Sequence, residues 1–143
     1  MAINVVARPI GVTSDFVTGG QGSIEARSGT ALKLANMASD EGLTPLELMD
    51  AALAGCLVLS VRIAARKSGL MDRLSNVHVE VKHAKAPEGP SRVASFTTAF
   101  RIDGDLTEAE RAALIAEAHA LCTVGNTLEH GATIEDVVLE ETV

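Results

Sequence analysis

Tryptophan and tyrosine are absent from this 143-residue sequence, and its only aromatic side chains are three phenylalanines, 2% of the chain. So small an aromatic set in practice excludes stacking platforms for nucleic-acid bases and aromatic cages for cations. Hydrophobic residues still make up 47% of the chain. The core must therefore be aliphatic, and a chain of this length can bury roughly 68–70% of its unfolded surface without any staple.

Positive charge is also scarce. Twelve lysines and arginines stand against nineteen aspartates and glutamates, which gives a net charge of −7. This balance argues against a nucleic acid or an anionic membrane as the main partner. The opening residues, Met1–Arg8, have neither the basic start nor the apolar core of an export signal. We therefore expect a cytoplasmic protein.

Cysteine occurs only twice, at Cys56 and Cys122. In a reducing compartment such pairs are more often catalytic or redox-active than structural. A buried free cysteine can also act simply as a small hydrophobic side chain, and this alternative stays open for both residues.

The longest predicted element is a helix that runs from Thr44 to Lys67. Thr44 can cap its start, Pro45 occupies the first helical position, and Glu47 completes a capping box. Gly69 can adopt the left-handed conformation that ends a helix. These signals fix both ends of the helix.

Between those ends, nearly every residue of the predicted helix is apolar or small, which is typical of a buried helix. Charged residues, among them Asp50 and Arg62, interrupt the run and argue against a membrane span. Cys56 lies near the middle. We expect it in the protein interior or at a junction between subunits.

The rest of the chain reads as short strands and two further helices. The predicted elements are strands at 3–7, 12–16, 23–27 and 30–35, strands at 77–83 and 93–102, helices at 107–122 and 123–129, and a strand at 133–143. This order predicts a single α+β domain spanning 1–143, with antiparallel sheets packed around the long buried central helix.

Two segments carry a family resemblance. The segment 44–56, with its Thr-Pro start and Ala-Gly-Cys end, resembles the first-cysteine helix of the OsmC/Ohr family of osmotically inducible and organic hydroperoxide resistance proteins. The segment 121–131, Leu-Cys-Thr-Val-Gly-Asn-Thr-Leu-Glu-His-Gly, resembles the second motif, usually Cys-Pro-Val followed by Thr-Leu. The order of strands around both segments also fits this family.

The resemblance implies an intertwined homodimer that reduces organic hydroperoxides, with no metal or other cofactor. Cys56 would attack the peroxide and become a sulfenic acid. Cys122 would resolve it as a disulfide, which a dithiol or small-thiol reductant then reopens. Glu47 lies in the region of a family glutamate and is the third predicted catalytic residue, although helix capping explains it equally well.

One position departs from the family pattern. The organic-hydroperoxide branch carries an arginine after a Thr-Gly-Gly sequence, and Gln21 stands there in this chain. Neither Arg8 nor Arg27 matches the motif. An amide can donate a hydrogen bond to a thiolate but brings no charge. Gln21 therefore favours an alternative function, in which a catalytically weak relative binds a small apolar ligand or senses oxidants slowly.

Two further chemistries remain possible from the residues alone. His119 and Cys122 are three residues apart on one predicted helix and could share a zinc ion, although no second ligand pair accompanies them. Cys56 with a distant histidine could form the nucleophile and base of a hydrolase. The glycines of segment 18–22 lack the lysine and following helix of a phosphate-binding loop and predict a turn.

Overall fold

The computed structural model describes residues 7–141 and divides into two compact units. Unit 1 ends at Met49 and unit 2 begins at Asp50, so their boundary falls inside the longest helix. Each unit is described by itself. The predicted first strand, 3–7, lies outside the described residues except for Ala7.

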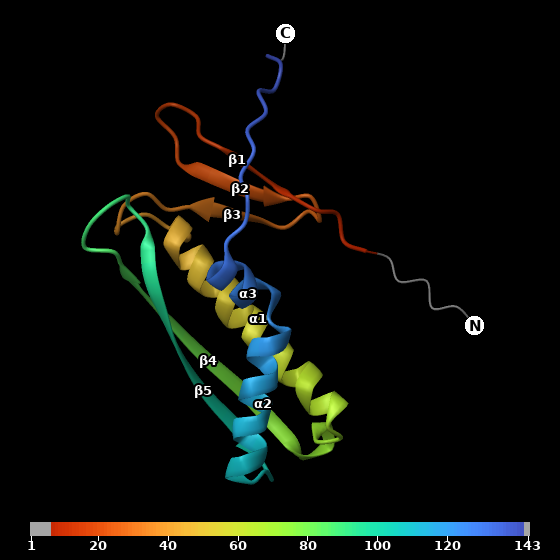
Figure 1. Cartoon of the computed structure of the whole chain (residues 1–143). Coiled ribbons are helices and arrows are strands. Elements are labelled where there is room, and N and C mark those ends of the chain that lie inside the picture. The colour runs from red at the N-terminus through yellow and green to blue at the C-terminus, as the bar shows by residue number, and fades with distance from the viewer. Residues whose placement is uncertain (1–6, 142–143) are drawn as a thin grey trace. The chain divides into compact units, whose positions relative to one another are not determined.

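Unit 1 contains a three-stranded antiparallel sheet, coloured red to orange in Figure 1. Its strands are β1 (Val12–Asp15), β2 (Gly22–Ala26) and β3 (Ala31–Leu34), and β2 is central. Ser14 pairs with Ile24, which in turn pairs with Leu32. All three strands lie where the alternating sequence predicts them, because glycine-containing turns separate them.

Helix α1 (Pro45–Lys67) begins and ends at the predicted residues. At its start the Thr44 amide donates to the Glu47 carboxylate at 2.7 Å, and the Glu47 amide donates back to the Thr44 hydroxyl at 3.2 Å. At its end Gly69 has a φ of +73°. The Leu70 amide then donates to the Ala65 carbonyl at 2.8 Å, which satisfies a helix-end acceptor.

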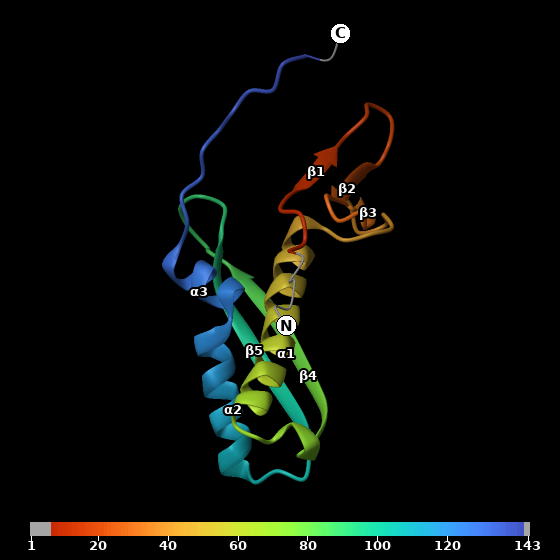
Figure 2. The same cartoon turned by 90° about the vertical axis from the view of Figure 1, so that its right-hand side faces the viewer.

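Unit 2 holds most of α1, a long hairpin and two more helices (Figure 1). Its further elements are the 3₁₀ turn Met71–Arg73, β4 (Leu74–Lys85), β5 (Val93–Gly104), α2 (Glu108–Leu121) and α3 (Thr123–His130). The strands pair antiparallel, with Val79 opposite Phe100. Figure 2 shows α1 and α2 side by side along the hairpin. The α+β class with antiparallel sheets is confirmed.

Two apolar clusters hold unit 2 together. The first joins α1, β5 and α2 through Val61, Ala64, Ala65, Ile102, Leu106, Leu114 and Ala118. The second surrounds Leu53, Leu57 and Cys122, with Phe96 and Leu128 packed against it. As the composition predicts, the fully buried side chains are aliphatic or sulfur-containing. By length and hydropathy α1 could cross a membrane, but its packing makes it the core helix of a globular fold.

A polar contact also joins α1 to the hairpin. His83 Nδ1 of β4 lies 2.7 Å from Asp50 Oδ2 of α1. Both side chains are largely buried, 25% and 21% exposed. Asp50 is the first residue of α1 that belongs to unit 2. The contact therefore attaches this part of α1 to the loop end of the β4–β5 hairpin.

The expectation that α1 is buried all round is not met in the single chain. Ala52, Gly55, Leu59 and Ile63 recur every three or four residues and form an exposed apolar row, here named the outer stripe. Leu59 is 56% exposed and Ile63 is 48% exposed. An apolar helix face of this kind needs a partner surface, which the described part of one chain does not supply.

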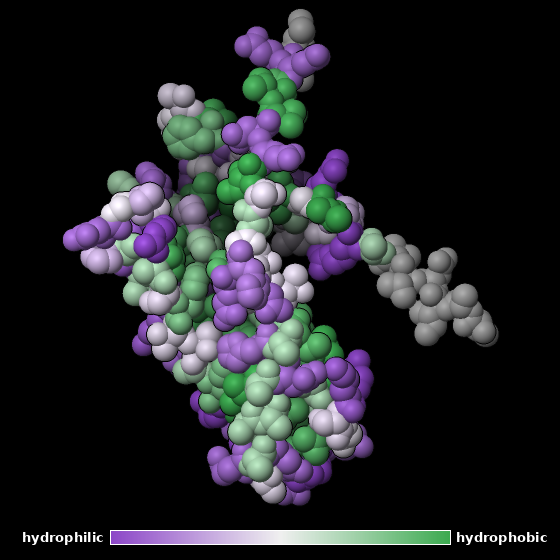
Figure 3. All heavy atoms as spheres, in the orientation of Figure 1, coloured by the Kyte–Doolittle hydropathy of each residue, from purple (hydrophilic) through white to green (hydrophobic). Residues whose placement is uncertain are grey.

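The predicted final strand is wrong for its described part, 133–141, which is irregular. The segment does contain residues that favour strands. Figure 3 shows apolar and polar residues intermixed near the C-terminus. Ile134 and Val138 are at least 90% exposed. Residue alternation alone does not make a strand, because a strand also needs the backbone of a neighbour to pair with.

Candidate redox site

Cys56 and Cys122 are brought together in unit 2 from elements 66 residues apart in the chain. Cys56 lies on α1 and is partly exposed, whereas Cys122 lies between α2 and α3 and is fully buried. Both are free thiols, Cys56 packs against the apolar cluster that contains Cys122, and each thiol influences the pKa of the other. Two thiols in direct contact are the minimum that a reversible disulfide requires.

Cys122 is held by the start of α3. Helix α2 ends at Leu121, and Cys122 takes an extended conformation (φ −74°, ψ 102°) that makes it the N-cap of α3. Its sulfur accepts a hydrogen bond from the Gly125 amide at 3.2 Å. A Cβ atom at Gly125 would lie 3.3 Å from that sulfur, so glycine allows the close approach.

The surroundings of Cys56 favour its thiolate. Burial opposes ionisation and is the largest single influence. It is outweighed by hydrogen bonds from the Cys122 thiol, the Val124 amide, the Ser60 hydroxyl and the Thr123 amide, which together lower the pKa of Cys56 below its ordinary value. Cys56 is therefore the better nucleophile of the two.

Cys122 behaves in the opposite way. Burial and the hydrogen bond to Cys56 raise the pKa of its thiol, although the Gly125 amide acts against them. Negative charge on Cys56 also opposes ionisation of Cys122. When one proton is lost from the pair, it should therefore come from Cys56 rather than from Cys122.

A cavity of about 360 Å³ lies in unit 2 close to Cys122. Leu53, Phe96 and Leu128 supply apolar parts of its wall, and His119 is among its polar residues. Gly125 lines the cavity, and its backbone amide donates to the Cys122 sulfur, although neither cysteine is among the lining residues. A mixed wall of this kind can accept an alkyl chain with a polar end.

The structure places Glu47 at the start of α1, two and a half turns before Cys56 on the same helix. Its carboxylate accepts from the Thr44 amide, and this bond, followed by that with the Thr44 hydroxyl, lowers the pKa of Glu47. Helix capping thus accounts for its observed contacts. Its catalytic role stays a prediction.

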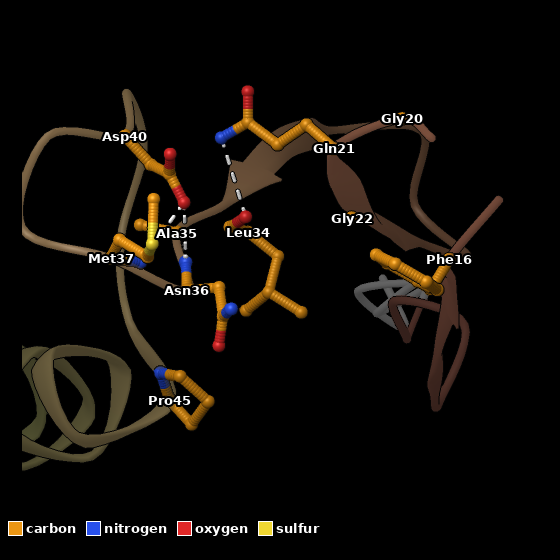
Figure 4. Close-up of a pocket in the computed structure, with 10 residues that line it drawn as sticks. All are labelled: Phe16, Gly20, Gln21, Gly22, Leu34, Ala35, Asn36, Met37, Asp40 and Pro45. Carbon is orange, nitrogen blue, oxygen red and sulfur yellow. Dashed lines mark hydrogen bonds between the residues drawn. The ribbon is translucent and has the colours of Figure 1, made fainter. Parts of the chain in front are cut away.

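Gln21 is used within unit 1. Its side-chain amide donates to the carbonyl of Leu34 at 3.3 Å and to that of Glu41 at 2.5 Å. Figure 4 shows it beside a pocket of about 580 Å³, whose apolar wall includes Phe16 and Met37. The amide therefore ties together backbone segments of its own unit.

The structure adds no ligand to the alternative of a zinc ion shared by His119 and Cys122. Among the described residues, no three histidine, cysteine, aspartate or glutamate side chains could hold a metal ion together. The ring of His119 instead packs edge-on against Phe100, with centroids 5.6 Å apart at 70°.

Three of the groups that lower the pKa of Cys56, namely Ser60 and the amides of Thr123 and Val124, could not be singled out from the sequence patterns used above. Ser60 lies one helical turn after Cys56 and is only 3% exposed. A lone hydroxyl in an otherwise apolar helix was a usable signal for it. The Thr123 amide had no such signal, because a backbone donor depends on how α3 is placed against α1.

The fold and the site together define an α+β protein with a long core helix and a contacting cysteine pair. The family model described as OsmC-like protein matches residues 38–135, which contain both cysteines. The chain belongs to the OsmC-like protein family. A comparison with curated proteins found no match.

Solved structures with this fold come from several bacteria. An OsmC-like protein from Mycoplasma pneumoniae has a TM-score of 0.74 at 14% identity, over 87% of this chain and 89% of that one. An organic hydroperoxide resistance protein OsmC from Legionella pneumophila has 0.66 at 22%, over 82% and 86%. OhrB of Bacillus subtilis, also an organic hydroperoxide resistance protein, has 0.64 at 18%, over 82% and 87%.

Proposed function

We propose that this protein is a thiol-dependent peroxidase that reduces organic hydroperoxides to alcohols. The observation that carries the proposal is the contact between Cys56 and Cys122, whose pKa values are shifted in opposite directions. Such a difference is what a peroxidatic and a resolving thiol require. Family membership and neighbours with organic hydroperoxide resistance in their names support the same chemistry.

The reaction has three balanced steps. The Cys56 thiolate attacks the outer oxygen of R–O–O–H, the O–O bond breaks, and the alkoxide takes a proton from solvent and leaves as an alcohol. The Cys122 thiol then attacks the Cys56 sulfenic acid, which releases water and forms the disulfide. Two thiol groups of a dithiol or small-thiol reductant reopen that disulfide and are themselves oxidised to a disulfide.

The apolar part of the cavity supports an organic substrate. Leu53, Phe96 and Leu128 offer surface to an alkyl or aryl group in the cavity near Cys122. Hydrogen peroxide gains nothing from such a wall, because it has no apolar surface to bury. Reduction of organic hydroperoxides should therefore be faster than reduction of hydrogen peroxide.

The proposal includes a homodimer in the cytoplasm. The outer stripe of α1 supports the dimer, since exposed apolar rows of this kind are typical of interfaces. A reducing compartment suits two thiols that must return to the free state after each cycle. Glu47 remains the third proposed catalytic residue.

The test is stopped-flow oxidation of the reduced protein by cumene hydroperoxide and by hydrogen peroxide, with free thiols counted and peptides identified by mass spectrometry. We expect fast loss of two thiols with the organic oxidant and a linked Cys56–Cys122 peptide. Cys56→Ser should not react, and Cys122→Ser should lose one thiol. Oxidation no faster than that of free cysteine would refute the peroxidase.

Gln21 favours a second candidate function. Its amide is occupied by backbone carbonyls and brings no charge to a thiolate. The adjoining pocket in unit 1 is large enough for a small apolar ligand. In this case the protein binds such a ligand or senses oxidants slowly, and the stopped-flow experiment yields only slow, stoichiometric oxidation.

A further inference from the structure

We infer that Gly125 positions the Cys122 thiol for disulfide formation with Cys56. This inference rests on the proposed function and deepens its second step, in which Cys122 resolves the oxidised Cys56. Gly125 has no side-chain chemistry of its own and acts through Cys122, so it is a positioning residue. It contributes one backbone donor and the space left by a missing side chain.

The backbone of Cys122 is held at the junction of α2 and α3. Its carbonyl accepts a helical hydrogen bond of α3, from the Asn126 amide at 2.9 Å. The Asn126 side chain donates to the Ala120 carbonyl at 3.2 Å and so ties the end of α2 to the same turn. Because the backbone is held on both sides, the place of the sulfur depends mainly on rotation about the Cα–Cβ bond of Cys122.

The Gly125 amide favours one of these rotations. It donates to the Cys122 sulfur at 3.2 Å, and through this bond the sulfur caps α3. The amide belongs to the first turn of α3, where N–H groups have no carbonyl acceptor within the helix. A rotation that moves the sulfur away leaves this partly buried donor without its partner, which is unfavourable.

The missing side chain of Gly125 leaves the space that the sulfur needs. A Cβ atom there would lie 3.3 Å from the Cys122 sulfur and 3.6 Å from Leu53 Cδ1. The first distance is tighter than an ordinary contact between carbon and sulfur. The Cys122 side chain is fully buried and Leu53 is 5% exposed, so a methyl group would displace the sulfur or push α3 away from α1.

Either displacement would affect the approach of Cys122 to Cys56. Leu53 precedes Cys56 by three residues, so their side chains lie on the same side of α1. Cys56 packs against the cluster formed by Leu53, Leu57 and Cys122. The Cys122 sulfur must reach the Cys56 sulfur in one geometry, and small misplacements of reacting atoms lower rates by large factors.

Gly125→Ala is the test variant. It keeps the amide that donates to the sulfur and adds only the methyl group. Gly125 lies inside α3 with a negative φ, and alanine is the better helix former, so the variant should fold. Thr127→Ala is the matched control. It places alanine at an exposed position of the same helix, where the lost hydroxyl donates to the Thr123 carbonyl.

The first readout is the equilibrium of the cysteine pair with glutathione, measured on the full chain by acid quenching, alkylation and mass spectrometry. One oxidised glutathione accepts the two thiol hydrogens, which gives the Cys56–Cys122 disulfide and two reduced glutathiones. We expect Gly125→Ala to lower the equilibrium constant for the disulfide about tenfold, and Thr127→Ala to match the parent. Equal constants, or a parent that forms only mixed disulfides with glutathione, would overturn the inference.

The second readout separates the two steps of peroxide reduction. With one equivalent of cumene hydroperoxide, Cys56 should be oxidised equally fast in Gly125→Ala and in the parent, because the added methyl group lies against Cys122 and Leu53. Dimedone should then label more Cys56 sulfenic acid in the variant, because the disulfide closes more slowly. A merely structural role would lower the urea midpoint without changing the ratio of labelled protein to disulfide.

A further pair of variants decides the matter if Gly125→Ala does not fold. Cys122→Ser keeps an acceptor at the N-cap of α3, whereas Cys122→Ala removes it. Hydrogen exchange of the Gly125 amide should therefore be faster in Cys122→Ala than in Cys122→Ser. Equal exchange in the two variants would show that this amide does not hold the side chain at position 122.

The glutathione equilibrium involves no peroxide, so the two proposals can fail separately. A lowered equilibrium constant in Gly125→Ala, together with slow oxidation of the parent by cumene hydroperoxide, supports the role of Gly125 and refutes the peroxidase. Fast oxidation of the parent with equal equilibrium constants does the reverse.

Discussion

The imidazole of His83 and the carboxylate of Asp50 meet at 2.7 Å and connect β4 to α1. The second oxygen of Asp50, Oδ1, is buried and has no hydrogen-bond partner among the described residues. The pair is thus a polar contact between α1 and the end of the β4–β5 hairpin that lies near its loop. Because Asp50 is only six residues before Cys56, this link also bears on where the cysteine helix lies.

His83→Ala should lower the free energy of unfolding by about 1–3 kcal/mol, because it leaves a buried carboxylate without its partner. Urea denaturation would measure the loss. His78→Ala is the control: His78 pairs with Glu80 at 3.2 Å, but both side chains are well exposed, at 44% and 60%. That change should cost less than about 0.5 kcal/mol. Equal losses in the two variants would contradict the structural role of the Asp50 contact.

Cys122→Ser should trap the oxidised form of Cys56. Without the resolving thiol, the sulfenic acid formed by cumene hydroperoxide has no partner, and dimedone should label Cys56 with one adduct per chain. The parent should give little adduct, because Cys122 closes the disulfide first. Equal labelling of parent and variant, measured by intact mass spectrometry, would show that Cys122 does not resolve Cys56.

Oxidation of Cys56 should depend on pH in a defined direction. Against the opposing effect of burial, hydrogen bonds lower the pKa of Cys56, so the thiolate persists to lower pH than in free cysteine and is lost only as pH falls through the lowered pKa. The rate with cumene hydroperoxide should therefore level off at a pH below about 8.5, the ordinary thiol value. A rate still rising steeply above that pH would contradict the lowered pKa.

Glu47→Gln separates capping from catalysis. Glutamine can also complete a capping box, so the helix start and the urea midpoint should stay close to those of the parent. A catalytic role, in which the Glu47 carboxylate orients a group that stabilises the thiolate, predicts slower oxidation of Cys56 once that carboxylate charge is lost. Thr44→Ala is the comparison, since it weakens the same cap without changing that charge. Parent-like oxidation by Glu47→Gln would leave Glu47 with capping alone.

Leu59→Glu should dissociate the proposed homodimer. Leu59 lies in the outer stripe and is 56% exposed in the single chain. A carboxylate there would be buried without a partner if two such stripes met, whereas it is harmless on a free surface. Sedimentation velocity would give the mass of each species. Arg92→Glu, in the exposed loop between β4 and β5, is the control and should stay dimeric. A dimeric Leu59→Glu would place the interface elsewhere.

Local signals predicted most of the fold correctly. The capping box of Thr44 and Glu47 and the stop at Gly69 set the ends of α1, because each acts within a few residues. The strand 77–83 was predicted from its valine alternation and lies within β4. The prediction for the described part of the final segment, 133–141, failed for the opposite reason: its pattern suits a strand, but pairing needs a neighbour that a local pattern cannot supply.

The sequence by itself determined that two cysteines would lie on a core helix and at a helix junction, because both places follow from local helix signals. Only the tertiary structure decided that these thiols touch and that Cys56 ionises more readily than Cys122. Burial and hydrogen bonding depend on which residues meet across the fold. The Thr123 amide acquires its importance in the same way, since it lies at the start of α3 and can act on Cys56 only because the fold brings α3 against α1.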